Sequence, residues 1–308
     1  MKSGFIGKYN STSLFYFDNT NSIDIYNDSG ELYDTINYTF LQSNDNNKKG
    51  YNVYAITSFL DKVYCLLTAK QEHISTIKAF VYDYINKTPY EIVLPSEIYS
   101  EIIIKISMID YSFVVEQNKL FLIGGIMQDN KHIQKSIYTF DLSLYTFQKE
   151  KYQEFTLIPR YKHACTSQNG IIYIIGGFTS YPQSDSVISN EVQFGKYDNG
   201  VLHKFNVVKI EGEKPVLMID PQMKIVKDRY VVSFSGYQYS KIWILDTKDN
   251  KGKNYDLRNE GFDGFNNKND MHYLINYEFQ GEDKMKIVIG IIKYKEKQIL
   301  IKNLIIKL

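Results

Sequence analysis

Short runs of apolar residues, separated by polar turn residues, recur along the whole chain. Apolar and polar positions alternate in many of these runs, and no stretch sustains the 3.6-residue apolar period of a helix. The clearest unit is RYKHACTSQNGIIYIIGGF, residues 160–178, in which two apolar runs flank Asn169-Gly170. An Asn-Gly pair between two such runs is the strongest short-range signal for a β-hairpin. The pattern therefore predicts an all-β protein of short antiparallel strands.

The end of this hairpin recurs at a regular spacing. The second apolar run leads into Gly176-Gly177, and the run KLFLIGG at 119–125 ends in the same way. Alignment on the second glycine gives equivalent positions at 18, 68, 125, 177, 236 and 291, which are 50 to 59 residues apart. A period near 50 residues is typical of arrays in which each repeat is one four-stranded propeller blade. We expect this position to end the second strand of every blade.

The chain resembles the kelch-repeat β-propeller family over essentially its whole length. The resemblance depends on Arg160-x-x-His163 at the start of a strand, on the double glycines at 124–125 and 176–177, and on an aromatic–Asp strand end followed by another aromatic, as in Phe140-Asp141…Phe147. The family usually has Trp at that last position, where this chain has Phe or Tyr, and four of the six repeats lack the intact double glycine.

The resemblance implies a six-bladed kelch-type β-propeller that forms one domain over residues 1–308. Only 17 residues follow Ile291, so we expect the last blade to be incomplete. Its third strand would cover 299–303, and the apolar tail 304–306 would lie against a neighbouring strand. The expected blades are approximately 4–38, 51–95, 103–155, 160–210, 219–257 and 271–308. Their expected strands include 146–149, 171–175, 202–210 and 241–246.

Composition limits the classes of partner. The formal net charge is +1, which gives no reason to expect nucleic acid or an anionic membrane as the partner. No apolar run approaches the roughly 20 residues that span a bilayer, and the N-terminus lacks the apolar core of a signal peptide. The two cysteines, Cys65 and Cys165, make no disulfide framework. We therefore expect a cytoplasmic protein without membrane insertion.

Motifs that carry catalysis are missing from the sequence. It contains no GxxxxGK[ST] phosphate loop, no GxGxxG, no GxSxG and no HExxH. The five histidines show no metal-ligand spacing, and the cysteines are too far apart for a zinc site. We expect no catalytic residue, metal or cofactor, and no enzymatic activity.

The spacing of the strands places the long connections together. Within each repeat the first-to-second and third-to-fourth connections are short. The long ones join second to third strands and successive blades, so all of them leave on one face of a propeller. Binding residues concentrate on long loops that a rigid scaffold presents. The tyrosines and mixed charges on these loops suit a protein partner. The candidate partner-binding residues are Lys48, Lys49, His132, Tyr181, Asp185, Tyr237 and Tyr239, together with Arg160.

Arg160 has two interpretations. In the family such arginines often line the ligand pocket at the mouth of the channel, which implies a binding role. The alternative is structural, because a guanidinium offers five donors that can hold loop carbonyls. His163 is interpreted as structural, because it has no neighbouring carboxylate or cysteine in the sequence.

Three functions remain open from the sequence. The first is a module that binds another protein through the long-loop face. The alternative is a sugar-active enzyme similar to the sialic-acid mutarotases, which would need an Arg/Glu/His cluster at the channel mouth. The third is a subunit of a larger assembly. Since no BTB-type helical region precedes the propeller in this sequence, an adaptor role would depend on a separate chain.

Overall fold

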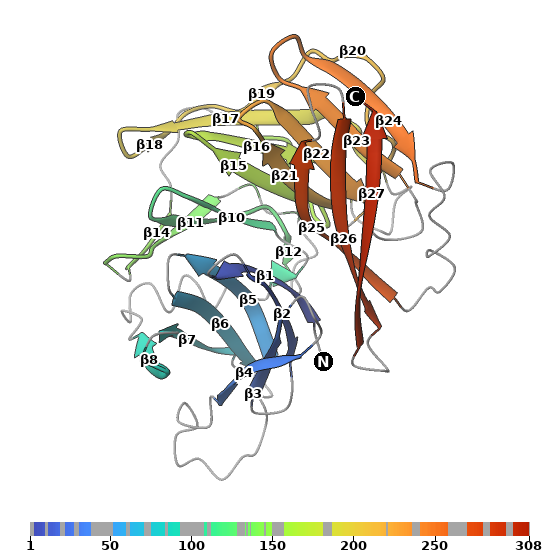
Figure 1. Ribbon diagram of the computed structural model, residues 1–308. Helices are drawn as coiled ribbons and strands as arrows, with labels where there is room; N and C mark the ends of the chain where they lie inside the picture. The colour runs from blue at the N-terminus through green and yellow to red at the C-terminus, as the bar shows by residue number, and fades with distance from the viewer. Residues whose placement is uncertain are drawn as a thin grey trace. The chain divides into compact units, whose positions relative to one another are not determined.

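The structure is a computed structural model, and every described element is a β-strand (Figure 1). The chain divides into two compact units, Met1–Ile106 with Gly290–Lys302, and Ser107–Ile289 with Asn303–Leu308. The single-domain organisation stays a prediction. The described residues are 3–9, 12–18, 22–27, 31–37, 52–59, 62–70, 75–83, 86–92, 108–109, 112–127, 133, 135, 137–144, 146–149, 157–180, 187–219, 221–235, 241–257, 270–279, 284–293 and 298–307.

The first unit contains two antiparallel four-stranded sheets, each in simple sequence order. Strands β1 and β5, the first strands of the two sheets, lie against each other. The first sheet is β1 (Ser3–Tyr9), β2 (Thr12–Asp18), β3 (Ser22–Tyr26) and β4 (Leu32–Asn37), and the second is β5 (Asn52–Phe59), β6 (Lys62–Lys70), β7 (Ser75–Asp83) and β8 (Thr88–Ile92).

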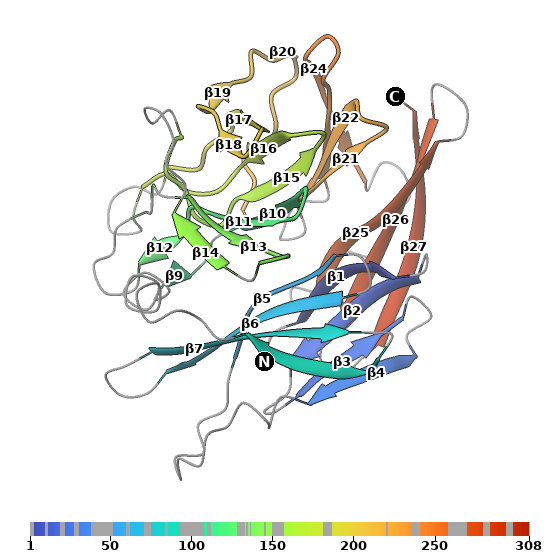
Figure 2. The ribbon, with the colours of Figure 1, turned by 90° about the vertical axis from the view of Figure 1, so that its left-hand side faces the viewer.

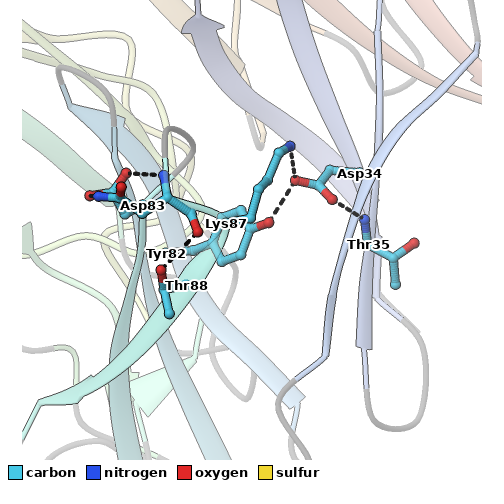
Figure 3. Close-up of polar contacts among 7 residues, drawn as sticks. Asp34, Thr35, Tyr82, Asp83, Lys87 and Thr88 are labelled. Carbon is cyan, nitrogen blue, oxygen red and sulfur yellow. Dashed lines mark hydrogen bonds and ion pairs between the residues drawn. The ribbon is translucent and has the colours of Figure 1, made fainter.

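A polar cluster ties the outer parts of these two sheets together (Figure 3). One carboxylate oxygen of Asp34, on β4, accepts hydrogen bonds from the Tyr82 hydroxyl (2.7 Å) and the Lys87 ammonium (2.6 Å). Its other oxygen accepts from the backbone N–H of Thr35. Burial and the bond to Asp34 raise the pKa of Tyr82. Tyr82 lies near the end of β7, and Lys87 lies in the turn between β7 and β8. The Asp34 carboxylate therefore holds both the strand and the turn.

Three sheets of four or five strands follow one another along the described part of the second unit (Figures 1 and 2). The third sheet is β10 (Ser112–Glu116), β11 (Lys119–Ile123), β13 (Ile137–Asp141) and β14 (Thr146–Lys149). The fourth is β15 (Ala164–Gln168), β16 (Ile171–Ile175) and β17 (Val192–Asp198), with β18 (Val201–Leu202) and β19 (Asn206–Val207) both paired to β17. The fifth is β21 (Pro221–Val226), β22 (Tyr230–Ser235), β23 (Lys241–Asp246) and β24 (Lys251–Asp256).

Three further pieces complete the described strands. Strand β20 (Glu211–Gly212) pairs in parallel with the outer strand β24, and β9 (Met108–Ile109) pairs with β12 (Ile126–Met127). The Glu213 carbonyl accepts a hydrogen bond from the Trp243 indole N–H (2.9 Å), which holds the β20 segment over the sheet edge. The last sheet has three strands, β25 (Asp270–Phe279), β26 (Lys284–Lys293) and β27 (Gln298–Lys307).

Apolar clusters fill the spaces between successive sheets of the second unit. Strands β11 and β13 are buried almost throughout, as expected for strands covered on both faces. The first strands β10, β15 and β21 lie side by side. Phe121 of the third sheet meets Tyr197 of the fourth edge-to-face, with ring centroids 4.9 Å apart. One cluster joins sheets three and four, through residues including Val114, Ile123, Ile172 and Tyr197, and another joins sheets four and five, through Ala164, Val192, Val231 and Trp243.

Many predicted strands and turns are confirmed. The strands predicted at 146–149, 171–175 and 241–246 have the predicted bounds. The Asn169-Gly170 turn joins β15 to β16, and both of its residues have positive φ. The all-β class is confirmed for the described residues.

Three predictions of detail are wrong. The double glycines directly follow the ends of β11 and β16, as predicted. At the equivalent positions of two other repeats, Thr68 and Gly290-Ile291 lie inside β6 and β26, because those strands continue their pairing. The single strand predicted at 202–210 is broken into β18 and β19. The last sheet has three strands as expected, but β27 continues to Lys307 where a strand ending at 303 was predicted.

Candidate functional site

The kelch-like segment lies at the start of the fourth sheet. Arg160 and His163 were predicted to open the first strand, but that strand begins at Ala164, and both residues lie in the connection before it. The reason is local: Tyr161 makes only an isolated bridge to Phe178, and Lys162 has φ of +54°. The two side chains are therefore fixed by tertiary contacts and not by strand pairing.

Arg160 is 1% exposed. Its guanidinium donates to the carbonyls of Gly176 (3.0 Å) and Glu191 (3.3 Å) and to the side-chain oxygen of Gln193 (3.0 Å). Burial lowers the pKa of Arg160 to about 10, and the charge of Glu191 opposes this shift. The side chain is still cationic at neutral pH. These contacts favour the structural interpretation of Arg160, and its direct contact with a partner stays a prediction.

Sequence reasoning missed Gln193. Its side chain is fully buried, and its carboxamide oxygen accepts from both Arg160 and the backbone N–H of Ile158 (3.0 Å). The signal was present in the sequence, because Gln193 is a lone amide within the strand Val192–Asp198. A buried amide needs hydrogen-bond partners, and here the partner is the arginine of the motif.

His163 is buried beside the double glycine of the preceding sheet. Burial lowers its pKa to about 3, with a smaller effect from the charge of Arg160. The backbone carbonyl of His163 accepts from the hydroxyl of Ser112 on β10. The imidazole is therefore neutral in the folded protein at neutral pH, and the residue links sheets three and four.

The double glycines have one contact in common. The N–H of Gly125 donates to the Arg160 carbonyl, and the N–H of Gly177 donates to the Met218 carbonyl, both at 2.9 Å. In each case the second glycine bonds the segment that leads into the next sheet. A Cβ at Gly176 would lie 2.7 Å from the Met218 carbonyl oxygen, so the close approach requires glycine. The same junction is thus repeated on both sides of the fourth sheet.

The junction also fixes the base of a long connection. Phe178 bridges to Tyr161 on one side and to Ile188 on the other, and the Tyr161 and Phe178 rings stack with centroids 5.2 Å apart. The N–H of Thr179 donates to the Val187 carbonyl, and that of Ser189 donates to the Gly177 carbonyl. Both ends of the 181–186 segment therefore leave from one short, closed ladder.

The other candidate partner-binding residues lie outside the described residues. They are Lys48, Lys49, His132, Tyr181, Asp185, Tyr237 and Tyr239.

The described residues show no arrangement typical of a metal centre. No group of three or more His, Cys, Asp or Glu side chains there could hold a metal ion. Cys165, a partly buried free cysteine on β15, has a raised pKa because of burial. Such a thiol is a poor nucleophile. The side chain of Cys65 lies outside the described residues.

In the part of the chain that the structure describes, no helix has the length and apolarity needed to cross a bilayer.

Comparison with known proteins agrees with the geometry of the fourth sheet. Residues 159–189 match the Kelch motif. No curated protein matches the chain. The matched residues contain Arg160, His163, the hairpin, the double glycine and the closed base of the long connection. The chain therefore carries a kelch repeat at residues 159–189, which supports its place in the kelch-repeat family.

Proposed function

We propose that this protein is a six-bladed kelch-type β-propeller that binds another protein through its long connections, without catalysis. Among the described residues, six successive sheets of three or more strands support this blade count. The packing of the first strands β10, β15 and β21 supports it, since the innermost strands of neighbouring blades meet around a propeller axis.

The alternation of short and long connections carries the functional proposal. In the second unit, residues 117–118, 169–170 and 227–229 join the first and second strands of their sheets, and 199–200 and 247–250 join the third and fourth. The longer segments 176–191 and 257–269 begin at the opposite ends of their sheets. Successive strands are antiparallel, so these longer segments leave on one face. A rigid scaffold that presents long loops on one face suits partner recognition.

The environment of Arg160 is relevant to the sugar-active alternative. That function needs carboxylates that converge on the guanidinium. Among the described residues its hydrogen-bond acceptors are backbone carbonyls and the amide of Gln193. This arrangement supports the binding module over the enzyme.

The test is affinity capture with paired variants. In one variant a Gly-Ser sequence of equal length replaces 181–186, and in a second Lys48 and Lys49 become Glu. The control is Lys248→Ala with Asp249→Ala, on the short β23–β24 turn at the other end of the sheet. We expect the wild type and the control to retain the same partner and the loop variants to lose it, with all melting temperatures nearly equal. Unchanged capture by both loop variants would contradict the proposal.

A further inference from the structure

The outer part of the fourth sheet contains a groove that lies apart from the long connections. Along β17 the residues alternate: Gln193, Gly195 and Tyr197 are buried, whereas Phe194, Lys196 and Asp198 point to the other face. The groove has a volume of about 810 Å³. Its lining includes Phe194, Lys196, Asp198, His203, Lys204 and Asn206.

The broken outer strand shapes this groove. Phe205 turns inward, and its ring would lie 2.9 Å from a Cβ at Gly195. Glycine at this position therefore lets the ring bury itself against β17. The inward turn interrupts the strand between β18 and β19 and leaves His203 and Lys204 exposed at the groove. The break is thus a packed feature of the sheet.

The charges in the groove are unbalanced. The Asp198 carboxylate lies 2.5 Å from the Lys196 ammonium and 3.7 Å from Nε2 of His203. The bond from Lys196 is the main cause that lowers the pKa of Asp198. One carboxylate is thereby shared by two basic side chains. The Lys204 ammonium has no carboxylate partner in the part of the chain that the structure describes. The groove thus offers excess positive charge beside the Phe194 ring.

We propose that this groove binds an acidic, extended segment of a partner protein. Carboxylates of the segment would pair with Lys204 and Lys196, and an apolar side chain would lie against Phe194. The volume is in the range of roughly 300–1,000 Å³ typical of ligand sites, which suits a few peptide side chains. Two lysines and a histidine are few for a nucleic acid, whose affinity depends on many phosphate contacts. The positive charge of the groove therefore favours an acidic peptide over a nucleic acid.

This site is separate from the long connections. It lies on β17, β18 and β19, whereas the proposed partner face is formed by segments such as 176–191. Substitutions in the groove leave those connections unchanged, so either proposal can fail while the other stands.

The direct test is a binding assay with a synthetic probe. The probe is a fluorescein-labelled peptide of about nine residues, about 30 Å when extended, with glutamates on both sides of a central Phe. We expect saturable binding by fluorescence anisotropy that weakens when salt is raised from about 0.05 to about 0.5 M, because salt screens exposed charges. The same peptide with Gln in place of every Glu should not bind.

Matched charge reversals locate the site. Lys204→Glu should weaken binding about five- to tenfold, since it replaces an attraction by a repulsion at an exposed position. Lys209→Glu makes the same change at an exposed lysine outside the groove lining, and we expect less than about a twofold effect. Phe194→Ala should weaken binding without changing its dependence on salt.

Three results would overturn the proposal. The first is no saturable binding of the acidic peptide to the wild type. The second is equal loss of affinity in Lys204→Glu and Lys209→Glu, which would indicate general attraction to the surface. The third is tighter binding of a single-stranded oligonucleotide of similar length and charge, which would make the groove a nucleic-acid site.

Discussion

The guanidinium of Arg160 donates hydrogen bonds to acceptors inside the protein. It is the most deeply buried cation described, and its contacts are carbonyls and one amide of its own sheet. The resemblance to the kelch family implied a binding role for this arginine. In the structure its guanidinium joins the segment before β15 to the end of β16 and the start of β17. Its removal would leave these acceptors without their donor.

Arg160→Met keeps much of the side-chain volume and removes the donors. We expect the free energy of unfolding to fall by about 2–4 kcal/mol, the usual scale for breaking a buried hydrogen-bond network. Urea denaturation provides the measurement. The control is Arg229→Met: Arg229 is 43% exposed and pairs with Asp246 at 2.5 Å, so its loss should cost about 0–1 kcal/mol. Equal effects of the two substitutions would show that the buried network contributes nothing.

His163 should make stability depend on pH. Its folded pKa is about 3, compared with 6.5 for an ordinary histidine, so only the unfolded chain binds its proton between these values. Above about pH 6.5 neither state binds it and stability is unaffected. As pH falls from 6.5 toward 3 the folded state loses stability, by on the order of 2 kcal/mol at pH 5. Arg160 is the charged group that acts on this imidazole.

The comparison of His163→Gln with the wild type isolates this effect. Carboxylates contribute the same pH dependence to both proteins, so the difference between their unfolding free energies should change between pH 7 and pH 5, on the scale of the shifted titration. Parallel curves for His163→Gln and the wild type would show that His163 does not titrate on unfolding.

At the scale of elements, the double glycine determines how one sheet leads into the next. Gly177 and Gly200 have the same φ of +79°, but their surroundings differ. A Cβ at Gly177 would lie 2.8 Å from the Cβ of His163 and would also contact the Tyr161 carbonyl, whereas a Cβ at Gly200 would have no neighbour within 4 Å. The pair separates the cost of backbone conformation from the cost of a clash.

Gly200→Ala should therefore cost about 1–2 kcal/mol, the penalty of left-handed backbone for a residue with a Cβ. Gly177→Ala should cost about 1–3 kcal/mol more, because the junction must also shift to make room. Thermal unfolding of both variants gives the comparison. Equal melting temperatures for Gly177→Ala and Gly200→Ala would mean that the junction accommodates the added Cβ without further cost.

Strand positions were predictable where local pattern and tertiary packing agree. The runs at 171–175 and 241–246 are apolar and bounded by turn residues, and both form strands with the expected bounds. The break at 203–205 was not predictable, because it depends on Phe205 meeting Gly195 across the sheet. The β20 pairing was missed for the same reason. A sequence shows which segments are extended, but it does not show which distant edge they will pair with.

The candidate site was predictable only in part. Arg160, His163 and the double glycine were identified from their spacing, and they lie together in the structure. Gln193, the partner of Arg160, is separated from it by 33 residues, and no local pattern joins them. The loop residues were selected by the lengths of the connections. Length does not determine the conformation of a loop, so their arrangement stays a prediction.

At the scale of the whole chain, the C-terminal residues belong to the second unit. Residues 303–308 are grouped with it, although the first half of β27 is not. Leu304 and Ile306 are 5% and 0% exposed, and Ile305 between them is 50% exposed. This alternation is that of a strand with one buried face.

Ile306→Ala should lower the free energy of unfolding by about 2–4 kcal/mol, because it removes buried methyl groups and leaves a cavity. Ile305→Ala, the same change one residue earlier, should lie within about 0.5 kcal/mol of the wild type. Deletion of 304–308 should be at least as costly as Ile306→Ala. A deletion without effect on the melting temperature would show that the end of β27 does not contribute to stability.

The parallel pairing of β20 with β24 has a consequence for solubility. An outer strand with free N–H and C=O groups can template the addition of a strand from another molecule. Here Glu211 and Glu213 donate their N–H groups to the carbonyls of Asn250 and Gly252, both at 2.8 Å, so the chain occupies this edge with its own backbone. The protecting segment also precedes β24 in the chain and leaves the ribosome first. When β24 is synthesised, β20 is already available to pair with it. Addition of a strand from another molecule at this edge therefore requires β20 to detach.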